Sequence, residues 1–143
     1  EFRLQGWGNI ASMTFVKKYN DTPKFNLPAP VLEIFLSTPG GDVFHPAPVE
    51  ALVDSGADIT AIPRRLIDQL QLKLVDQLPT MGYEGITPEK LTDVYSVKVL
   101  IRDVGDYIVR VIPSNYDYAL IGRDIINSWD LFLRGKTGIF EIS

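Results

Sequence analysis

The sequence contains no cysteine and only one histidine, His45. The chain therefore has no thiol nucleophile, no disulfide framework and too few ligands for a Cys/His metal site. No apolar run approaches the roughly 20 residues that span a bilayer, and the N-terminus lacks the apolar core of a signal peptide. We expect a protein that needs no metal or other cofactor, does not bind a membrane and resides in the cytoplasm.

Positive charge is also scarce. The 14 basic residues are outnumbered by 18 acidic ones, which gives a formal net charge of −4 and a pI near 4.9. No basic field exists that would attract nucleic acid. A chain of 143 residues, 45% of them hydrophobic, can bury one core but is too short to suggest two domains.

The N-terminal part has the composition of an arm. The chain does not begin with methionine, so residues 1–12 read equally as a remnant of an expression vector or as the cut end of a longer protein. Residues 17–30 are polar and rich in proline, with no sustained period. We expect residues 1–30 to be an arm, or a vector or precursor remnant, and residues 31–143 to be the folded domain.

From Val31 onward, short β-like runs alternate with turn signals, a pattern typical of a mostly-β barrel or sandwich. Strands are predicted over residues 31–36, 48–53, 118–121, 131–133 and 139–142, and a β-hairpin over residues 95–101 and 107–112. The glycines at 82 and 85 and Pro88 predict a turn or hairpin tip over residues 78–88.

One or two short helices are expected within this β pattern. Pro63 can occupy the first turn of a helix, and Leu66, Ile67 and Leu70 follow at helical spacing, so we predict a helix over residues 63–70. A second helical turn is expected after Gly122, reaching to about residue 129.

The strand predicted at 48–53 runs directly into Asp54-Ser55-Gly56. This tripeptide places a carboxylate, a hydroxyl and a backbone without a Cβ at one tight turn, held by the sheet behind it, which suits catalysis. Asp, Ser and Gly are also common turn residues, so the tripeptide alone is a weak signal. A second element, residues 120–124 (Leu-Ile-Gly-Arg-Asp), follows near the end of the chain.

Together the two elements resemble the retropepsin family of aspartic proteases, over about residues 31–142. The resemblance implies a closed β-barrel or sandwich of the retropepsin type and aspartic endopeptidase activity. Asp54 matches the catalytic aspartate, and Ser55 matches the hydroxyl that holds the two active-site loops together across the dimer. Gly56 matches the position where the backbone approaches the substrate, which a Cβ would obstruct.

The resemblance assigns further residues. Asp58 and Arg123 match an ion pair near the dimer interface, and Ala57, Asp58 and Ile59 lie beside the substrate, where Ile59 favours apolar side chains. Other residues match the flap (Gly82, Tyr83, Glu84, Gly85) and the C-terminal dimerisation strand (Ile139, Phe140, Ile142). The flap has fewer glycines than in the viral enzymes, and Tyr83 and Glu84 read equally as exposed turn residues.

One chain supplies only half of such a site. Peptide hydrolysis by this route needs two carboxylates that share one proton, and only one Asp-Ser-Gly occurs here, since Asp103-Val104-Gly105 lacks the hydroxyl. We therefore expect a homodimer with two-fold symmetry that cleaves an extended peptide or protein substrate. The coupled carboxylates predict a bell-shaped activity profile at acidic to mildly acidic pH.

Three other interpretations have less support. Asp54 and Asp58 have no defined geometry as a glycosidase pair, and a Ser-His-Asp triad would place His45 on a proline-rich loop. The main rival is a retropepsin-fold module that dimerises or binds peptides without cleaving them. The intact Asp54-Ser55-Gly56 argues against this rival, because a non-catalytic module need not keep two like charges at its interface.

Overall fold

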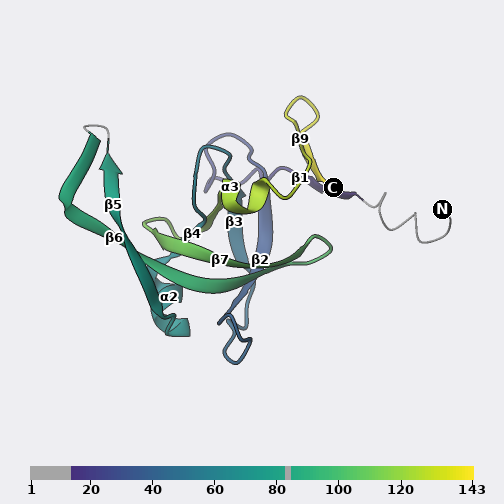
Figure 1. The fold of residues 1–143 in the computed structure, drawn as a ribbon. Coiled ribbons are helices and arrows are strands. Elements are labelled where there is room, and N and C mark those ends of the chain that lie inside the picture. The colour runs from purple at the N-terminus through teal and green to yellow at the C-terminus, as the bar shows by residue number, and fades with distance from the viewer. Residues whose placement is uncertain (1–13, 83–84) are drawn as a thin grey trace, which may run out of the picture.

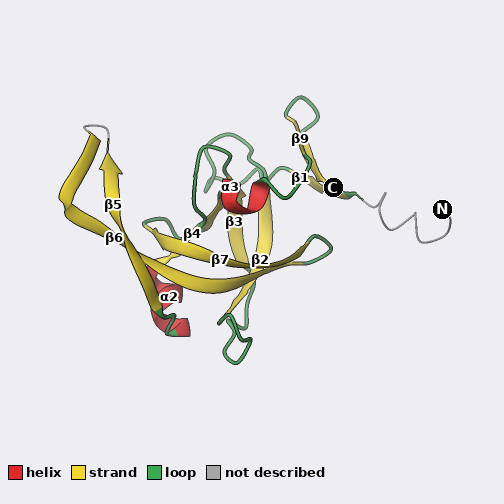
Figure 2. Ribbon diagram, viewed as in Figure 1, coloured by secondary structure: helices red, strands yellow, loops and turns green. Residues whose placement is uncertain are grey.

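Ten strands form two sheets in the part of the chain that the computed structural model describes, residues 14–82 and 85–143 (Figure 1). The three-stranded sheet contains β1 (Phe15–Lys18), β10 (Ile139–Ile142) and β9 (Leu131–Arg134) in that order. The seven-stranded sheet has, in order, β2 (Val31–Ser37), β3 (Val49–Val53), β8 (Ala119–Ile121), β4 (Ala61–Pro63), β7 (Gly105–Ser114), β6 (Gly85–Ile101) and β5 (Leu74–Gly82). This mostly-β architecture confirms the predicted fold class (Figure 2).

The larger sheet curls back on itself around the core. The end of β2 pairs with β6, with Phe35 opposite Leu100, although these strands lie far apart in the sheet order. Alternate residues of the strands point inward, as period-two patterning dictates. The fully buried side chains include Leu32, Ile34, Val97 and Ile121.

The helix predicted at residues 63–70 is present as α2 (Arg64–Leu70). Its three apolar residues, Leu66, Ile67 and Leu70, are all buried. Pro63 precedes the first turn, and Gln71 ends the helix in the left-handed conformation, with φ of 50°. The second helix, α3 (Arg123–Ile126), is a single turn, and no helix in the described ranges is long and apolar enough to cross a membrane.

The turn or hairpin tip predicted over residues 78–88 belongs to a hairpin, but the strands of that hairpin extend further than predicted. β5 and β6 continue through this region, and Gly82 pairs with Gly85. The register shifts between Pro79, opposite Leu91, and Thr80, opposite Thr87, so residues 88–90 of β6 remain without a partner in the ladder. Pro88 lies in this irregularity, as expected for a residue that cannot donate a ladder hydrogen bond.

Residues 14–30 pack on the rest of the chain. β1 pairs with β10, with Phe15 opposite Ile142, and the bridge between Asn20 and Ala29 closes the following loop. Phe25 is only 7% exposed, and its ring lies 4.8 Å from that of Tyr118. The division of the chain at residue 31 stays a prediction about domain organisation.

Candidate active site

Asp54 lies where two parallel strands end. β3 and β8 pair in parallel, with Val53 opposite Ile121, and the Asp54 N–H donates to the Ile121 carbonyl at 2.9 Å. Parallel neighbours bring their carboxyl ends to the same edge of a sheet, so the residues that follow them meet there. The half-buried Asp54 is thus placed beside Gly122 and Arg123, which are distant in sequence.

The turn after Asp54 orients its carboxylate. The Asp54 carbonyl accepts the Ala57 N–H at 3.1 Å, and Asp54 Oδ1 accepts the Gly56 N–H at 3.0 Å. A Cβ on Gly56 would lie 3.2 Å from that same Oδ1. Asp54 Oδ2 has no hydrogen-bond partner among the described residues, so this oxygen remains available to a ligand.

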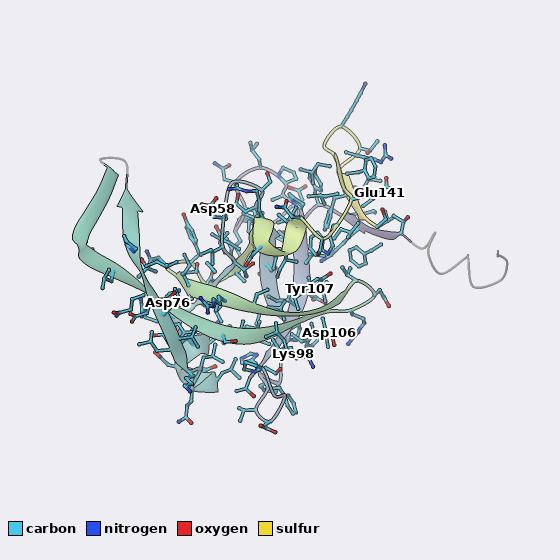
Figure 3. All side chains as sticks on the ribbon, in the orientation of Figure 1. Asp58, Asp76, Lys98, Asp106, Tyr107 and Glu141 are labelled. Carbon is cyan, nitrogen blue, oxygen red and sulfur yellow. The ribbon has the colours of Figure 1, made fainter. Side chains whose placement is uncertain are left out.

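Arg123 makes three contacts with the loop that follows Asp54. Its N–H donates to the Ala57 carbonyl at 2.8 Å, and its Nη1 donates to the Ser55 carbonyl at 2.7 Å. Its Nη2 forms an ion pair with Asp58 Oδ1, which is the pairing expected from the sequence. Asp58 lies near α3 (Figure 3), and the pair ties this helical turn to the Asp54 loop within one chain.

A polar network centred on the buried Thr60 lies beneath the loop. Thr60 is fully buried; its hydroxyl donates to Asp124 Oδ1 at 2.7 Å and accepts the Gly122 N–H at 3.1 Å. Asp124 Oδ2 also accepts the Thr60 N–H at 3.1 Å. Both the hydroxyl and the N–H of Thr60 are thus hydrogen-bonded, so these contacts can fix the relative position of the two loops.

This pairing was not predicted from the sequence. Asp124 closes the Leu-Ile-Gly-Arg-Asp element, but nothing local marks Thr60 as its partner.

Gly122 is required by close packing. A Cβ at this position would lie 2.8 Å from the Ile59 carbonyl carbon and 3.0 Å from the Ala57 carbonyl oxygen. The φ of Gly122 is −92°, a value open to other residues, so the backbone contact excludes a side chain here.

The structure brings seven of the predicted site residues together, and these are Asp54, Ser55, Gly56, Ala57, Asp58, Ile59 and Arg123. The Ser55 hydroxyl is exposed and has no partner within residues 14–82 and 85–143. Gly82 and Gly85 pair at the far end of the β5–β6 hairpin, and Tyr83 and Glu84 lie outside the described residues.

The predicted dimerisation strand occupies the other sheet. Phe140 and Ile142 of β10 are buried in the core of their own chain, and β10 is flanked by β1 and β9. A dimer role for Ile139, Phe140 and Ile142 stays a prediction, and the edges of β10 are already paired.

A second cluster was not foreseen from the sequence. Lys24 Nζ lies 2.7 Å from Glu50 Oε1 and 3.5 Å from Asp117 Oδ2, and its hydrogen bond to Glu50 raises the pKa of Lys24 above its usual value. Burial raises the pKa of Tyr118, and the nearby Tyr116, Asp117 and Asp54 raise it further. The segment that contains Lys24 therefore packs on the sheet that carries Asp54.

The other interpretations gain no support from the geometry. The Asp58 carboxylate is engaged by Arg123, and His45 Nδ1 contacts the Ala47 carbonyl oxygen at 2.8 Å within its own loop. In the described part of the chain, no group of three or more His, Asp and Glu residues could hold a metal ion.

Comparison with known proteins identifies relatives of the chain. The family model described as "gag-polyprotein putative aspartyl protease" matches residues 44–128. Among solved structures, a retropepsin-like aspartic protease from Rickettsia conorii is 12% identical, with a TM-score of 0.58 over 91% of each chain. No curated protein matches the sequence.

Two viral proteases are also similar. The simian foamy virus (mac) protease is 21% identical over 66% of this chain and 91% of its own, with a TM-score of 0.47. The EIAV protease complexed with the inhibitor HBY-793 is 18% identical over 73% and 91%, with a TM-score of 0.49.

The family model spans more than half of this chain and includes both the Asp54 turn and the Arg123 element. The Rickettsia structure shows the same fold over nearly the whole length. The chain therefore belongs to the gag-polyprotein aspartyl protease family and has the retropepsin-like fold.

Proposed function

We propose that this chain is an aspartic endopeptidase that acts as a homodimer, with the Asp54 carboxylates of two copies meeting at a two-fold axis. The arrangement of Asp54 carries the proposal. Oδ1 is held by the Gly56 N–H, Oδ2 is free among the described residues, and the loop is fixed from behind by Arg123 and Thr60. Only one Asp-Ser-Gly occurs in the sequence, so the second carboxylate comes from a second copy.

Two such carboxylates can hydrolyse a peptide bond with one proton between them. The ionised Asp54 accepts a proton from a water molecule as the water oxygen bonds to the peptide carbon. The protonated copy gives its proton to the carbonyl oxygen, which yields a tetrahedral diol. Transfer of a proton to the amide nitrogen then allows the C–N bond to break, and a carboxylic acid and an amine result.

The surrounding residues suit a peptide substrate. Gly56 lets the substrate backbone approach the carboxylates, and the free hydroxyl of Ser55 can bond to the loop of the second copy. The substrate would lie as an extended strand beside Ala57 and Asp58, with the half-buried Ile59 favouring an apolar side chain.

The β5–β6 hairpin would cover the bound substrate. In this proposal Gly82, Tyr83, Glu84 and Gly85 form the flap.

The decisive experiment compares two Asp-to-Asn variants. The purified chain is incubated with a peptide library between about pH 4 and pH 7, and a statine-type inhibitor serves as a further check. Asp54→Asn should reduce cleavage by about 1,000-fold or more, because an amide cannot take the proton from water. Asp103→Asn should cleave at the parent rate, since Asp103 is exposed and its positive φ of 66° is tolerated by asparagine.

Equal cleavage by Asp54→Asn and the parent would refute the proposal. A parent that dimerises and binds peptides without cleaving them would instead be a binding module.

A further inference from the structure

The outer face of the larger sheet carries apolar side chains where strand alternation predicts polar ones. Phe35 of β2 lies opposite Leu100 of β6, and residues that lie opposite each other share a face. Leu100 points away from the core, because its neighbour Val99 is fully buried and side chains alternate along a strand. Ile108 of β7 lies opposite Lys98 on this same face and is also exposed. The outer face of β2, β6 and β7 is therefore partly apolar.

A hollow of about 370 Å³ lies on this face. Phe35 and Leu100 line it from the sheet, and Phe44 lines it from the loop that follows β2. The basic side chains of Lys98 and Arg102 also line it. Its volume falls within the range of about 300–1,000 Å³ that is typical of ligand pockets. An apolar hollow with basic groups beside it suits a ligand that is both apolar and anionic.

The loop after β2 is held in place, so the hollow is formed before a ligand arrives. The Thr38 N–H donates to the Val43 carbonyl at 2.8 Å, and the His45 N–H donates to the Leu36 carbonyl at 2.9 Å. Phe44 lies within this bonded loop, and yet it is 68% exposed. An ordered backbone thus presents a large ring to solvent beside other apolar side chains, as is typical of an interaction site.

Arg102 supplies a cation that no other group uses. Its guanidinium lies over the Phe35 ring, 5.4 Å from the centroid, and it makes no hydrogen bond or ion pair with any described residue. A guanidinium has a planar fork of N–H donors that can bind a carboxylate through two hydrogen bonds. Lys98 is 4.0 Å from Asp106, so two positive charges face one negative charge in the hollow. In a chain with a net charge of −4, this hollow favours an anion.

A second hollow, of about 250 Å³, adjoins the first. Phe35 and Arg102 line both hollows, whereas Phe15, Val16 and Ile101 line only the second. Its other charged lining residues are one lysine and two acids, so the excess of positive charge belongs to the first hollow. Together the two hollows form one groove. Alternate side chains of an extended peptide lie about 7 Å apart on one face, so a peptide can fill both hollows.

We propose that this groove binds an extended peptide segment of a partner protein, in which apolar side chains flank a glutamate or aspartate. The apolar side chains enter the two hollows, and the carboxylate binds Arg102. Among the described residues, none from the Asp54 loop lines either hollow. Figure 3 shows Lys98 and Asp106 toward the bottom of the view and Asp58 toward the top. The inference goes beyond the proposed function and does not depend on it.

Peptide binding by the Asp54→Asn chain tests the groove without cleavage of the probe. The probe is a fluorescein-labelled peptide with a phenylalanine two positions before and two positions after a glutamate, so that all three side chains share a face. Fluorescence anisotropy gives the affinity, and NMR shifts of backbone amides locate the peptide. We expect shifts at Ser37, Gly41 and Leu100. A matched probe with glutamine in place of glutamate should bind about tenfold more weakly or worse.

Two pairs of variants, made in the same Asp54→Asn chain, test the groove residues. Arg102→Gln should weaken binding by about tenfold or more. Arg110→Gln is its control, because Arg110 lies on the same face but lines neither hollow. Leu100→Thr should weaken binding by about fivefold, and Ile108→Thr, also outside both hollows, should not. All four side chains are exposed, and circular dichroism checks that each variant folds.

The possible results are distinct. Equal affinities of Arg102→Gln and Arg110→Gln overturn the groove, and so does the absence of saturable binding. Shifts at Gly56 and Ala57 in place of those in the groove also overturn it, because the probe then binds beside residue 54. Equal affinities for the glutamate and glutamine probes overturn the role of the carboxylate. Peptide cleavage by the parent is measured separately, so a failure of the groove and a failure of the proposed protease are distinguishable.

Discussion

At Gly122 the loop that carries Asp54 and the start of α3 touch backbone to backbone. The Gly122 N–H bonds to the Thr60 hydroxyl, and its Cα faces the Ile59 carbonyl group too closely for a methyl group. This crossing therefore leaves no room for a side chain between the loop after Asp54 and the start of α3.

Gly122→Ala should lower both stability and activity. The added methyl group would lie 2.8 Å from a backbone carbon, and backbone cannot yield as a flexible side chain can. We expect a loss of about 1–3 kcal/mol in the free energy of unfolding, measured by urea denaturation. Gly135→Ala is the control, since a Cβ there meets nothing within 4 Å; equal losses in both variants would contradict the packing argument.

Thr60→Val tests the buried network without changing the size of the side chain. The valine removes the hydroxyl that bonds to Asp124 and Gly122 and leaves the buried Gly122 N–H without that partner. We expect a loss of about 1–3 kcal/mol and slower peptide cleavage, whereas Thr60→Ser should retain most of both. A valine variant as stable as the parent would show that the hydroxyl has no structural role.

Local sequence was sufficient for part of the site. Asp54-Ser55-Gly56 is a contiguous turn, and Arg123 lies in a contiguous element, so both could be predicted. The bond between Thr60 and Asp124 joins residues 64 positions apart. Such a contact depends on how β3 and β8 pair, which no local pattern specifies.

Among the elements, long and strongly periodic segments were predicted best. α2 and the hairpin of β6 and β7 followed from helical spacing and alternation. β1 and β4 have only four and three residues, too few for a period to show, and β1 pairs with β10, which is distant in sequence. Residues 14–30 also pack on the rest of the chain, since Phe25 is buried against Tyr118.

Phe25→Ala measures how firmly this arm is attached. The ring is 7% exposed, so its removal should cost about 3–5 kcal/mol of unfolding free energy, read from thermal or urea denaturation. Leu27→Ala in the same arm is the control, because Leu27 is 79% exposed and should change stability by less than about 0.5 kcal/mol. Equal effects of the two changes would mean that the arm does not dock through Phe25.

At the scale of the whole molecule, two side chains, Lys24 and Tyr118, make the free energy of unfolding depend on pH in the alkaline range. The pKa of Lys24 is raised by its hydrogen bond to Glu50, and the pKa of Tyr118 is raised chiefly by burial. Each group holds its proton more tightly in the folded chain. The stability that this tighter proton binding adds is fully present below the ordinary pKa values of 10.5 for Lys24 and 10.0 for Tyr118. It is lost as the pH rises through the higher pKa values of the folded chain.

The free energy of unfolding should therefore fall as the pH rises through and above these ordinary values. Urea denaturation at a series of pH values would show the decline. Tyr118→Phe keeps the ring but removes the titrating hydroxyl, and Lys24→Met removes the ammonium group, so each variant should show a shallower decline than the parent. If both variants lose stability with pH as steeply as the parent, the decline arises from other titrating groups.

The class of the whole fold followed from the spacing of short strands and turns. The pairing that curls the sheet, β2 with β6, did not, because it joins distant segments with no distinctive residues. A homodimer was expected from the single Asp-Ser-Gly.

The order in which the chain is made bears on the Asp54 loop. This loop is synthesised well before residues 119–124, yet its backing comes from Ile121, Gly122 and Arg123. A nascent chain therefore holds Asp54 before the groups that orient it have been made. Under the proposed function, peptide cleavage would be withheld until residues 119–124 have been translated and have paired with β3.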